Sequence, residues 1–483
     1  MTGPVATPAD ALAVIDPKSY ADWNAALDLF DRLRAESPVV RIESPTDDHE
    51  PFWLVTKYDD VMRISKDNAT FLNAPRSVVF TNRGGEALAR EVTAKQGDES
   101  PNLVSSLVAL DAPKHPKLRR LTQDWFMPKN LRNLEGRVRE LAKATVERFI
   151  AAGPEADFVT HVAAPYPLHV VMQILGVPEE DEPKMLFLTQ QMFGGQDEDL
   201  SKSGMADMTP EMISQIVFGA VAEFETYFEG LAAQRRANPT DDVATILANA
   251  EIDGEPISAR DRAGYYIITA SAGHDTTSAS TAGAMLALAK DPEQFAKVKA
   301  DRSLLANIVE EAIRWTTPVQ HFMRVANEDV ELSGVKIAKG DRVGMFYGSA
   351  NYDEEVFDKP FEFNVLRDPN PHVGFGGNGT HFCVGANLAR MEMIVAIEEW
   401  LKRIPEFRLD PAGKFRNAYL DEFVFGACQR NIQKPPAVFH RVHGSKIFTT
   451  RWWIGLLSVV VDANWRDRAS IGNEHPVFGF IES

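Results

Sequence analysis

The stretch Phe375-Gly376-Gly377-Asn378-Gly379-Thr380-His381-Phe382-Cys383-Val384-Gly385 decides the fold. It places one cysteine in a glycine-rich loop, directly before the helical pattern Ala386-Asn387-Leu388-Ala389-Arg390-Met391-Glu392-Met393. A thiolate at the start of a helix faces the free N–H groups of the first turn, and these donors favour negative charge. The glycines let the backbone approach a flat ligand without Cβ clashes. The pattern therefore favours a thiolate that faces a bound group.

A lone cysteine thiolate on such a loop suits the proximal ligand of a haem iron, to which it donates electron density that favours O–O cleavage. The alternative for Cys383 is a buried free cysteine beside a glycine turn, which the cysteine taken alone would favour. Four glycines and His381 cluster around Cys383, and two segments further upstream agree with the ligand interpretation. We therefore expect Cys383 to be the metal ligand.

The two upstream segments are Ala272-Gly273-His274-Asp275-Thr276-Thr277 and Glu311-Ala312-Ile313-Arg314. Glu and Arg one helical turn apart are common surface pairs, so the second segment alone says little. In this order, however, the three segments resemble the cytochrome P450 haem-thiolate monooxygenases, with the oxygen-binding part of a central helix, the E-x-x-R pair and the cysteine loop. The resemblance extends from about Pro17 to about Gly426. It implies a mainly α fold with a small β region (α+β), in which residues 1–443 form one large haem-binding domain and residues 444–483 a C-terminal extension of unknown role.

Composition limits the classes of partner and location. The net charge of -18 argues against nucleic acid as a partner. Two cysteines, Cys383 and Cys428, give no disulfide framework, and the N-terminal residues show no signal peptide or membrane anchor. We therefore expect a cytoplasmic protein that is monomeric and does not bind a membrane. The apolar run at 452–461 is about half as long as a bilayer span requires, so it indicates either an extension that packs on the body or an interfacial anchor.

The pattern of apolar residues predicts mostly helices. The stretch Asp261–Lys290 holds no proline and stops at Asp291-Pro292, so it is predicted to be one long helix. Residues 76–108 are predicted to be irregular, and the resemblance implies a mobile lid there. The remaining predictions are a helix at Trp23–Leu33, strands at Val39–Ile42 and Phe52–Thr56, a helix from Tyr58, and short strands between Val330 and Phe346.

Asp275, Thr276 and Thr277 are the candidate catalytic residues. Splitting dioxygen needs two protons delivered inside a mostly apolar cavity, and a threonine hydroxyl can donate while a carboxylate refills the relay. The hydroxyls, together with Gly273, could also relax the helical hydrogen bonds and leave a groove for dioxygen. The alternative is a small polar face where two helices cross. His274 is interpreted as a helix-surface residue, or as one that lies behind the site, and not as a metal ligand.

The resemblance assigns structural and cofactor roles to further residues. Glu311 and Arg314 would anchor the segment before the cysteine loop, with Phe363 and Arg367 nearby. His115 and Arg119 are four residues apart and share a helix face. The predicted contacts of haem b, most of them to its propionates, are His115, Arg119, Arg324, Phe375, His381, Cys383 and Gly385.

A basic segment around the first of these contacts has two interpretations. Lys114, Lys117 and Arg120 form either a solvated face or, with Arg390, a docking patch for a redox partner. Because no flavin or iron–sulfur domain is fused here, the resemblance implies electrons from NAD(P)H that arrive through a reductase and an iron–sulfur ferredoxin.

The resemblance also indicates a small hydrophobic substrate. Ala272, Val319, Phe423 and Phe425 are the predicted pocket residues, although apolar core is the equally ordinary interpretation of each. Gly376 stands where the family usually has phenylalanine, which resembles a subgroup that oxidises sterol side chains and branched lipids. The segments 272–278 and 314–324 instead resemble the bacterial α-terpineol hydroxylases.

We therefore expect O2-dependent hydroxylation of an unactivated C–H bond in a monoterpenoid or an alkyl-substituted cyclic or aromatic hydrocarbon. The alternatives are a steroid or branched-lipid side-chain hydroxylase, a non-catalytic haem sensor or carrier, and an enzyme that uses peroxide directly. The last two would not need the Asp275-Thr276 pair.

Overall fold

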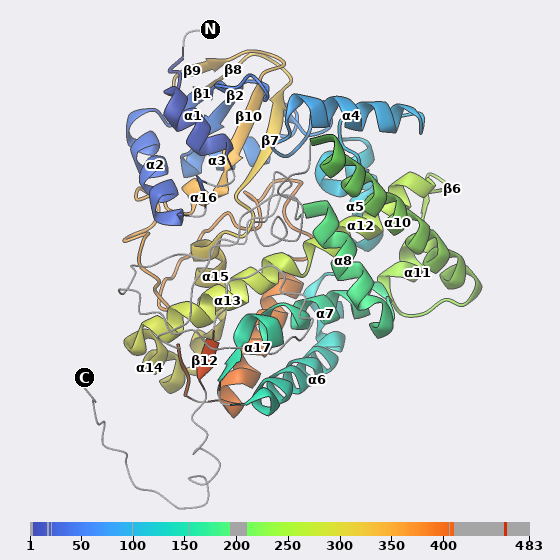
Figure 1. The fold of residues 1–483 in the computed structure, drawn as a ribbon, viewed down its shortest axis with the longest axis vertical. Helices are drawn as coiled ribbons and strands as arrows, with labels where there is room; N and C mark the ends of the chain where they lie inside the picture. Colours follow the sequence, from blue (N-terminus) through green and yellow to red (C-terminus); the bar gives the residue numbers. More distant parts are fainter. Residues whose placement is uncertain are drawn as a thin grey trace, which may run out of the picture.

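The computed structural model describes residues 3–16, 19–20, 22–98, 100–153, 155–193, 210–404, 406–409 and 458–460. Figure 1 shows a β-rich part, with α1, α2 and α3 beside the main sheet, and a larger helical part. The helices are α1 (Pro8–Ile15), α2 (Trp23–Glu36), α3 (Tyr58–Lys66), α4 (Arg83–Ala94), α5 (Lys114–Gln123), α6 (Pro128–Ala152), α7 (Pro165–Leu175), α8 (Glu182–Phe193), α10 (Pro210–Ala237), α11 (Val243–Ala248), α12 (Ala259–Ala272), α13 (Asp275–Lys290), α14 (Pro292–Ala300), α15 (Leu305–Thr316), α16 (Tyr347–Ala350) and α17 (Ala386–Arg403). The predicted class, mainly α with a small β region, is confirmed.

The main sheet has five strands in the order β1-β2-β10-β7-β3. They are β1 (Val39–Ile42), β2 (Phe52–Val55), β3 (Phe71–Leu72), β7 (His321–Ala326) and β10 (Arg342–Phe346). β10 pairs with β2 in parallel and with β7 antiparallel, and the second register sets Val343 opposite Arg324. β7 follows α15 after a short turn, so the sheet positions Arg324 beside the helical part of the molecule.

Three small sheets lie beside the main one within the described residues. β5 (Glu251–Ile252) pairs with β6 (Glu255–Pro256), and β8 (Val330–Leu332) pairs with β9 (Val335–Ile337). In the third sheet, β12 (Ser458–Val460) lies between β4 (Glu155–Asp157) and β11 (Arg408–Leu409). β12 is the described part of the predicted C-terminal extension, and the predicted boundary at 443 lies outside the described residues.

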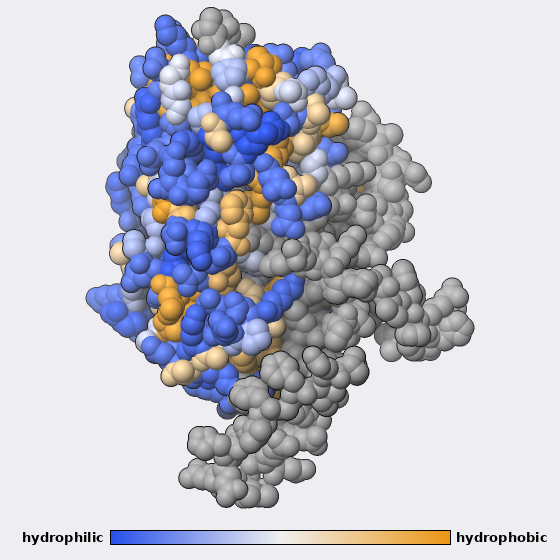
Figure 2. Space-filling model, turned by 90° about the vertical axis from the view of Figure 1, so that its left-hand side faces the viewer, coloured by the Kyte–Doolittle hydropathy of each residue, from blue (hydrophilic) through white to orange (hydrophobic). Residues whose placement is uncertain are grey.

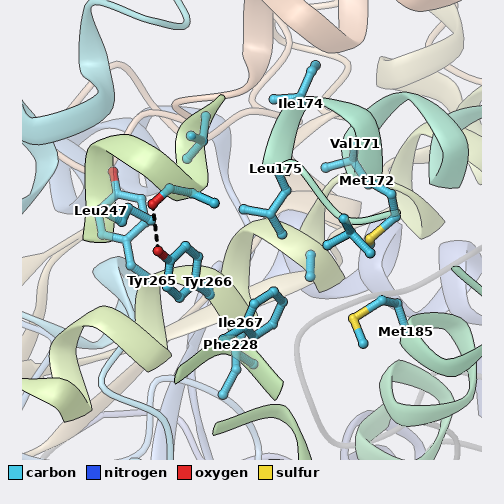
Figure 3. Close-up of a cluster of buried hydrophobic side chains, with 14 of the residues drawn as sticks. Val171, Met172, Ile174, Leu175, Met185, Phe228, Leu247, Tyr265, Tyr266 and Ile267 are labelled. Atoms are coloured by element: carbon cyan, nitrogen blue, oxygen red, sulfur yellow. Dashed lines mark hydrogen bonds between the residues drawn. The ribbon is translucent and has the colours of Figure 1, made fainter. Parts of the chain in front are cut away.

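A large apolar cluster holds α12 in place (Figure 3). Met172 and Leu175 of α7 pack with Phe228 of α10 and Tyr266 of α12, all of them buried. The rings of Phe228 and Tyr266 stack at 4.9 Å, and the Tyr266 hydroxyl donates to the Ala244 carbonyl at 2.7 Å. A close-packed cluster of this kind fixes a helix rigidly. The opposite side of α12 can therefore form a stable wall of the cavity described below.

The predicted helices and strands near the N-terminus are confirmed, but the prediction that residues 76–108 are irregular is wrong. The structure contains α2, β1, β2 and α3 at the predicted places. Residues Arg83–Ala94, however, form α4, because the Asn82 side chain accepts from the Gly85 amide at 2.7 Å and caps the helix. Glu86 of α4 is buried and accepts from Arg76 at 2.7 Å, which ties the helix to the body.

The predicted single helix Asp261–Lys290 is also wrong, because α12 ends at Ala272 and α13 begins at Asp275. A Cβ on Gly273 would lie 2.8 Å from Val171 Cγ2, so the chain passes α7 closely at this point. The Thr276 hydroxyl donates to the Ala272 carbonyl at 3.0 Å and satisfies it at the break. His274, predicted at the surface or behind the site, is 2% exposed, so the surface alternative is wrong.

One face of the described part is largely polar. The face in Figure 2 is mostly hydrophilic, with small and separate apolar patches. Among the described helices, none has both the length and the hydropathy needed to cross a bilayer.

Candidate active site

One cavity brings together residues from α5, α12, α13, the turn after α15, β7 and the cysteine loop. It contains about 1500 Å³ of empty space, its open mouth included. Eleven of the predicted catalytic, haem-contact and pocket residues line it, namely His115, Arg119, Ala272, Thr276, Thr277, Val319, Arg324, Phe375, His381, Cys383 and Gly385. Asp275 does not line it.

The cysteine loop closes on itself before α17. The Cys383 amide donates to the Phe375 carbonyl at 2.9 Å, and Cys383 lines the cavity. Burial raises the pKa of the Cys383 thiol, while the amides of Gly385 and Ala386 and the guanidinium of Arg119 act in the opposite direction. The loop therefore supplies donors that stabilise a thiolate, and a cation bound at the sulfur would stabilise the thiolate further.

Gly379 explains why the loop is rich in glycine. A Cβ at this position would lie 1.6 Å from the Ser65 carbonyl oxygen of α3, closer than atoms can approach. A Cβ on Gly377 would likewise lie 2.7 Å from Ser65 Cβ. The glycines therefore seat the loop on α3, in addition to opening the approach to the sulfur.

Four nitrogen-bearing side chains converge beside Cys383. The rings of His115 and His381 lie 4.0 Å apart, and burial lowers the pKa of His115 to about 4 and that of His381 to about 2, helped by the charges of Arg119 and Arg324. Neither arginine forms an ion pair with another described residue. Arg324 Nε and His115 Nε2 are buried and have no hydrogen-bond partner among the residues that the structure describes. Such a cluster is suited to an anionic ligand, because buried charges are stable only when paired.

The candidate catalytic residues of α13 point in different directions. Thr276 lines the cavity, whereas the Asp275 carboxylate accepts from His274 Nδ1 at 2.8 Å and is 31% exposed. The Thr277 hydroxyl donates to the Glu392 carboxyl group at 3.2 Å. The two threonines therefore serve different partners, and of the trio Thr277 is buried while Asp275 and Thr276 are partly exposed.

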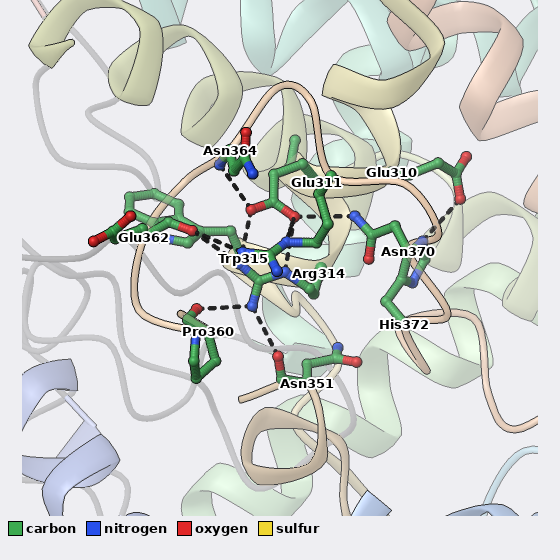
Figure 4. A network of polar contacts seen from close by, with 12 residues as sticks. Glu310, Glu311, Arg314, Trp315, Asn351, Pro360, Glu362, Asn364, Asn370 and His372 are labelled. Carbon is green, nitrogen blue, oxygen red and sulfur yellow. Dashed lines mark hydrogen bonds and ion pairs between the residues drawn. The ribbon is translucent and has the colours of Figure 1, made fainter. Parts of the chain in front are cut away.

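The predicted pair of Glu311 and Arg314 lies in a buried network (Figure 4). Glu311 accepts two hydrogen bonds from Arg314, both at 2.8 Å, one from Arg367 at 2.9 Å and one from the Asn364 amide at 2.9 Å. Arg314 also donates to the carbonyls of Asn351 and Pro360 at 2.9 Å. The ring of Phe363 contacts Trp315. The network ties α15 to residues 351–370, the segment that leads into the cysteine loop.

The rest of the cavity wall is mostly apolar. Ala272 and Val319 lie in it as predicted, while Phe423 and Phe425 lie outside the described residues. The sequence interpretation did not include many further lining residues, among them Leu107, Val108, Val171, Ile268 and Thr269. Ile268 and Thr269 could have been found from their position three or four residues before Ala272 on one helix face, whereas Val171 comes from α7 and carries no local signal.

The four basic residues of the predicted docking patch are mostly paired. Lys114 contacts Asp261 at 2.6 Å, Arg390 contacts Glu310 at 2.6 Å, and Lys117 pairs with Asp253. Arg120 is exposed and forms no ion pair with another described residue. The patch is therefore less positive than its sequence indicates.

A family model described as "Cytochrome P450" matches residues 48–426. The chain belongs to the cytochrome P450 family. It is 41% identical to cytochrome P450-terp of a Pseudomonas species over 399 residues, which is 83% of this chain and 92% of that protein. It is 38% identical to the steroid C26-monooxygenase of Mycolicibacterium smegmatis, over 74% of this chain and 78% of that protein. The crystal structure of CYP108D1 from Novosphingobium aromaticivorans matches with a TM-score of 0.79 and 60% identity, over 88% of this chain and 97% of that one.

Members of this family are monooxygenases that bind haem and take electrons from NAD(P)H through redox partners. The residues present fit that cofactor. Cys383 offers a thiolate to the iron, and the unpaired nitrogens of His115 and Arg324, with Arg119 and His381, fit the two propionates.

Proposed function

We propose that this monooxygenase hydroxylates an unactivated C–H bond of a small hydrophobic substrate, a monoterpenoid or an alkyl-substituted cyclic or aromatic hydrocarbon. The aliphatic wall formed by Leu107, Val108, Val171, Ile268 and Val319 carries the proposal, because it offers dispersion contacts and few polar partners. The 41% identity to cytochrome P450-terp supports the terpenoid class.

The residues of the cavity have distinct roles in the proposed reaction. When bound, haem with a thiolate ligand supplies the oxidising chemistry that inserts one oxygen atom of O2 into a C–H bond. Cys383 would hold the iron, and Arg119 and Arg324 would orient the propionates. Thr276 would present its hydroxyl inside the cavity, and Asp275 would exchange protons with solvent.

We further propose an iron–sulfur ferredoxin and its reductase as the redox partners. Arg120 of α5 supports this, because an exposed guanidinium without an ion pair can meet a carboxylate of an acidic partner. A monomer in the cytoplasm remains a prediction.

Oxidation of a steroid or branched-lipid side chain is the second candidate. Gly376 in the cysteine loop favours it, as do the 38% identity to a steroid C26-monooxygenase and the 36% identity to a methyl-branched lipid omega-hydroxylase of Mycobacterium bovis. A non-catalytic haem sensor or carrier, or an enzyme that uses peroxide directly, is disfavoured, because neither needs the Thr276 hydroxyl in the cavity or Asp275 beside it.

A binding panel of monoterpenoids, alkylbenzenes and sterols tests the substrate class. Displacement of water by a well-fitting substrate shifts the haem iron from low to high spin, which absorbance reports. Compounds that shift the spectrum are then incubated with NADH, ferredoxin and reductase, and the hydroxylated product is measured against the NADH consumed. A shift with sterols alone contradicts the first proposal, and absence of product with every compound that binds well favours the sensor.

A further inference from the structure

An ion pair that the proposed reaction does not use lies beside the cysteine loop. The Arg390 guanidinium of α17 donates to both oxygens of the Glu310 carboxylate of α15, at 2.6 and 2.8 Å. His372 Nε2 lies 2.9 Å from the same carboxylate, as Figure 4 shows. Burial alone would raise the pKa of Glu310, but hydrogen bonds from Arg390 and His372 lower it to about 2. Both members of the pair therefore carry their charge at neutral pH.

The pair is attached to the cysteine loop through an aromatic ring. The guanidinium carbon of Arg390 lies 4.5 Å from the centroid of the Phe375 ring, close enough for a cation–π interaction. The Phe375 carbonyl accepts from the Cys383 amide at 2.9 Å, and the Phe375 ring lies edge-on to that of Phe382, the residue before the cysteine. Arg390 is therefore held at a fixed place relative to the Cys383 sulfur.

Arg390 is one of two cations that act on this sulfur. Burial raises the pKa of the Cys383 thiol, and the charges of Arg119 and Arg390 are among the effects that lower it. Arg119 donates to the Phe382 carbonyl at 2.7 Å and forms no ion pair with another described residue. Arg390 instead faces the Glu310 carboxylate, whose opposite charge weakens the effect of the guanidinium at the sulfur. The charge that the thiolate experiences from this side therefore depends on both members of the pair.

A second ion pair on α17 offers a comparison at a greater distance from the loop. Arg403 pairs with Glu399, and its side chain is 23% exposed, similar to Arg390 at 30%. From position 390 to position 403 the helix rises about 20 Å at roughly 1.5 Å per residue. This distance is more than twice the Debye length of about 8 Å at physiological salt. The Arg403 charge should therefore have little effect at the sulfur.

We propose that the Glu310–Arg390 pair sets the reduction potential of the iron that Cys383 holds. Reduction adds one electron, Fe³⁺ + e⁻ → Fe²⁺, and the electron comes from the redox partner. A positive charge near the sulfur withdraws electron density from the thiolate and stabilises the reduced iron, so Arg390 raises the potential. Glu310 offsets part of this charge and lowers the potential. The proposal rests on Cys383 as the ligand of the iron and is independent of the proposed substrate.

Redox titration of the haem-loaded protein without substrate tests the proposal. Arg390→Gln should lower the potential and Glu310→Gln should raise it, because the first change removes the cation and the second removes the charge that offsets it. Each should change the ratio of oxidised to reduced protein at a fixed applied potential about threefold, which is the scale of a partly exposed charge. For one electron, this corresponds to about 30 mV, since a tenfold change is about 59 mV.

Two further variants separate charge from structure. Arg390→Lys keeps the positive charge and should stay near the wild-type potential, and Arg403→Gln is the matched control and should leave the potential unchanged. Opposite signs in Arg390→Gln and Glu310→Gln are decisive, because damage to the loop would shift both variants in the same direction. Shifts of the same sign, or no shift in either variant, overturn the proposal. Where Arg390→Gln retains too little haem for a titration, Glu310→Gln decides alone, because only a rise supports the proposal.

The infrared C–O stretch of the reduced carbon monoxide complex gives a second readout. A thiolate that donates more strongly to the iron increases back-donation into carbon monoxide and lowers this frequency. The band should therefore move down in Arg390→Gln and up in Glu310→Gln, and movement in one common direction contradicts the proposal. Both measurements are made without substrate. Failure of the substrate panel would therefore contradict the proposed substrate, whereas failure here would contradict the role of the ion pair.

Discussion

Glu311→Gln should strongly destabilise the fold and reduce haem retention. The substitution keeps the size of the side chain and removes its charge. In the wild type, this carboxylate faces two guanidinium groups, those of Arg314 at 0% exposure and Arg367 at 8% exposure. After the change, both remain buried without a carboxylate. Because this network joins α15 to residues 351–370, the cysteine loop should lose part of its support.

The magnitude follows from burial. Breaking a buried ion pair from one side costs about 3–5 kcal/mol. Arg314 retains its bonds to the Asn351 and Pro360 carbonyls, and glutamine can still accept one hydrogen bond, so we expect the lower end, about 3 kcal/mol. This corresponds to roughly a hundredfold change in the folding equilibrium.

Urea unfolding of the haem-loaded protein, followed by circular dichroism and haem absorbance, measures the effect as a shift of the midpoint. Glu310→Gln is the matched control on the neighbouring position. Glu310 pairs with Arg390 and His372 but is 27% exposed, so its loss should cost about 1 kcal/mol or less. Equal shifts in the two variants would refute the reasoning from burial.

Three further substitutions have distinct readouts. Thr276→Ala should still bind haem and substrate but divert electrons into hydrogen peroxide, measured per NADH consumed, and unchanged coupling would assign the relay elsewhere. Gly379→Ala forces a Cβ to within 1.6 Å of the Ser65 carbonyl oxygen and should abolish haem binding in a haemochrome assay, whereas normal haem content would show that the loop can shift. Arg120→Glu should slow electron transfer from a ferredoxin and weaken its salt dependence more than Lys117→Glu, because Lys117 already pairs with Asp253. Equal effects would mean that pairing within the protein does not matter for docking.

The cysteine loop could be predicted from sequence because its determinants are local. Glycine, thiolate and helix start lie within a few residues of one another, and the structure brings Phe375, His381, Cys383 and Gly385 to one cavity. The pairing of Glu311 with Arg314 was also predictable, since it spans one helical turn. Arg367, the other partner of Glu311, lies 56 residues further on, so only the family resemblance allowed its position to be predicted.

Features that depend on contacts between distant segments were missed. The break after Ala272 follows from the close approach of Gly273 to Val171, about which the proline-free sequence says nothing. The sequence predicted a positive patch because it did not show that Lys117 pairs with Asp253, which lies 136 residues away. The pairing of Glu310 with Arg390 gave no signal, since the two residues lie 80 positions apart in the sequence. The start of α4 was different, because Asn82 is a local capping signal that the interpretation did not use.

The most direct test of the account is the absorbance of the reduced carbon monoxide complex in Cys383→Ser. If Cys383 is the ligand of the haem iron, the strongly red-shifted Soret band of the wild type should be lost in this variant, while Cys428→Ser should keep it. Retention of the red-shifted band in Cys383→Ser would contradict the assignment on which the site, the proposed control of the reduction potential and the proposed reaction all depend.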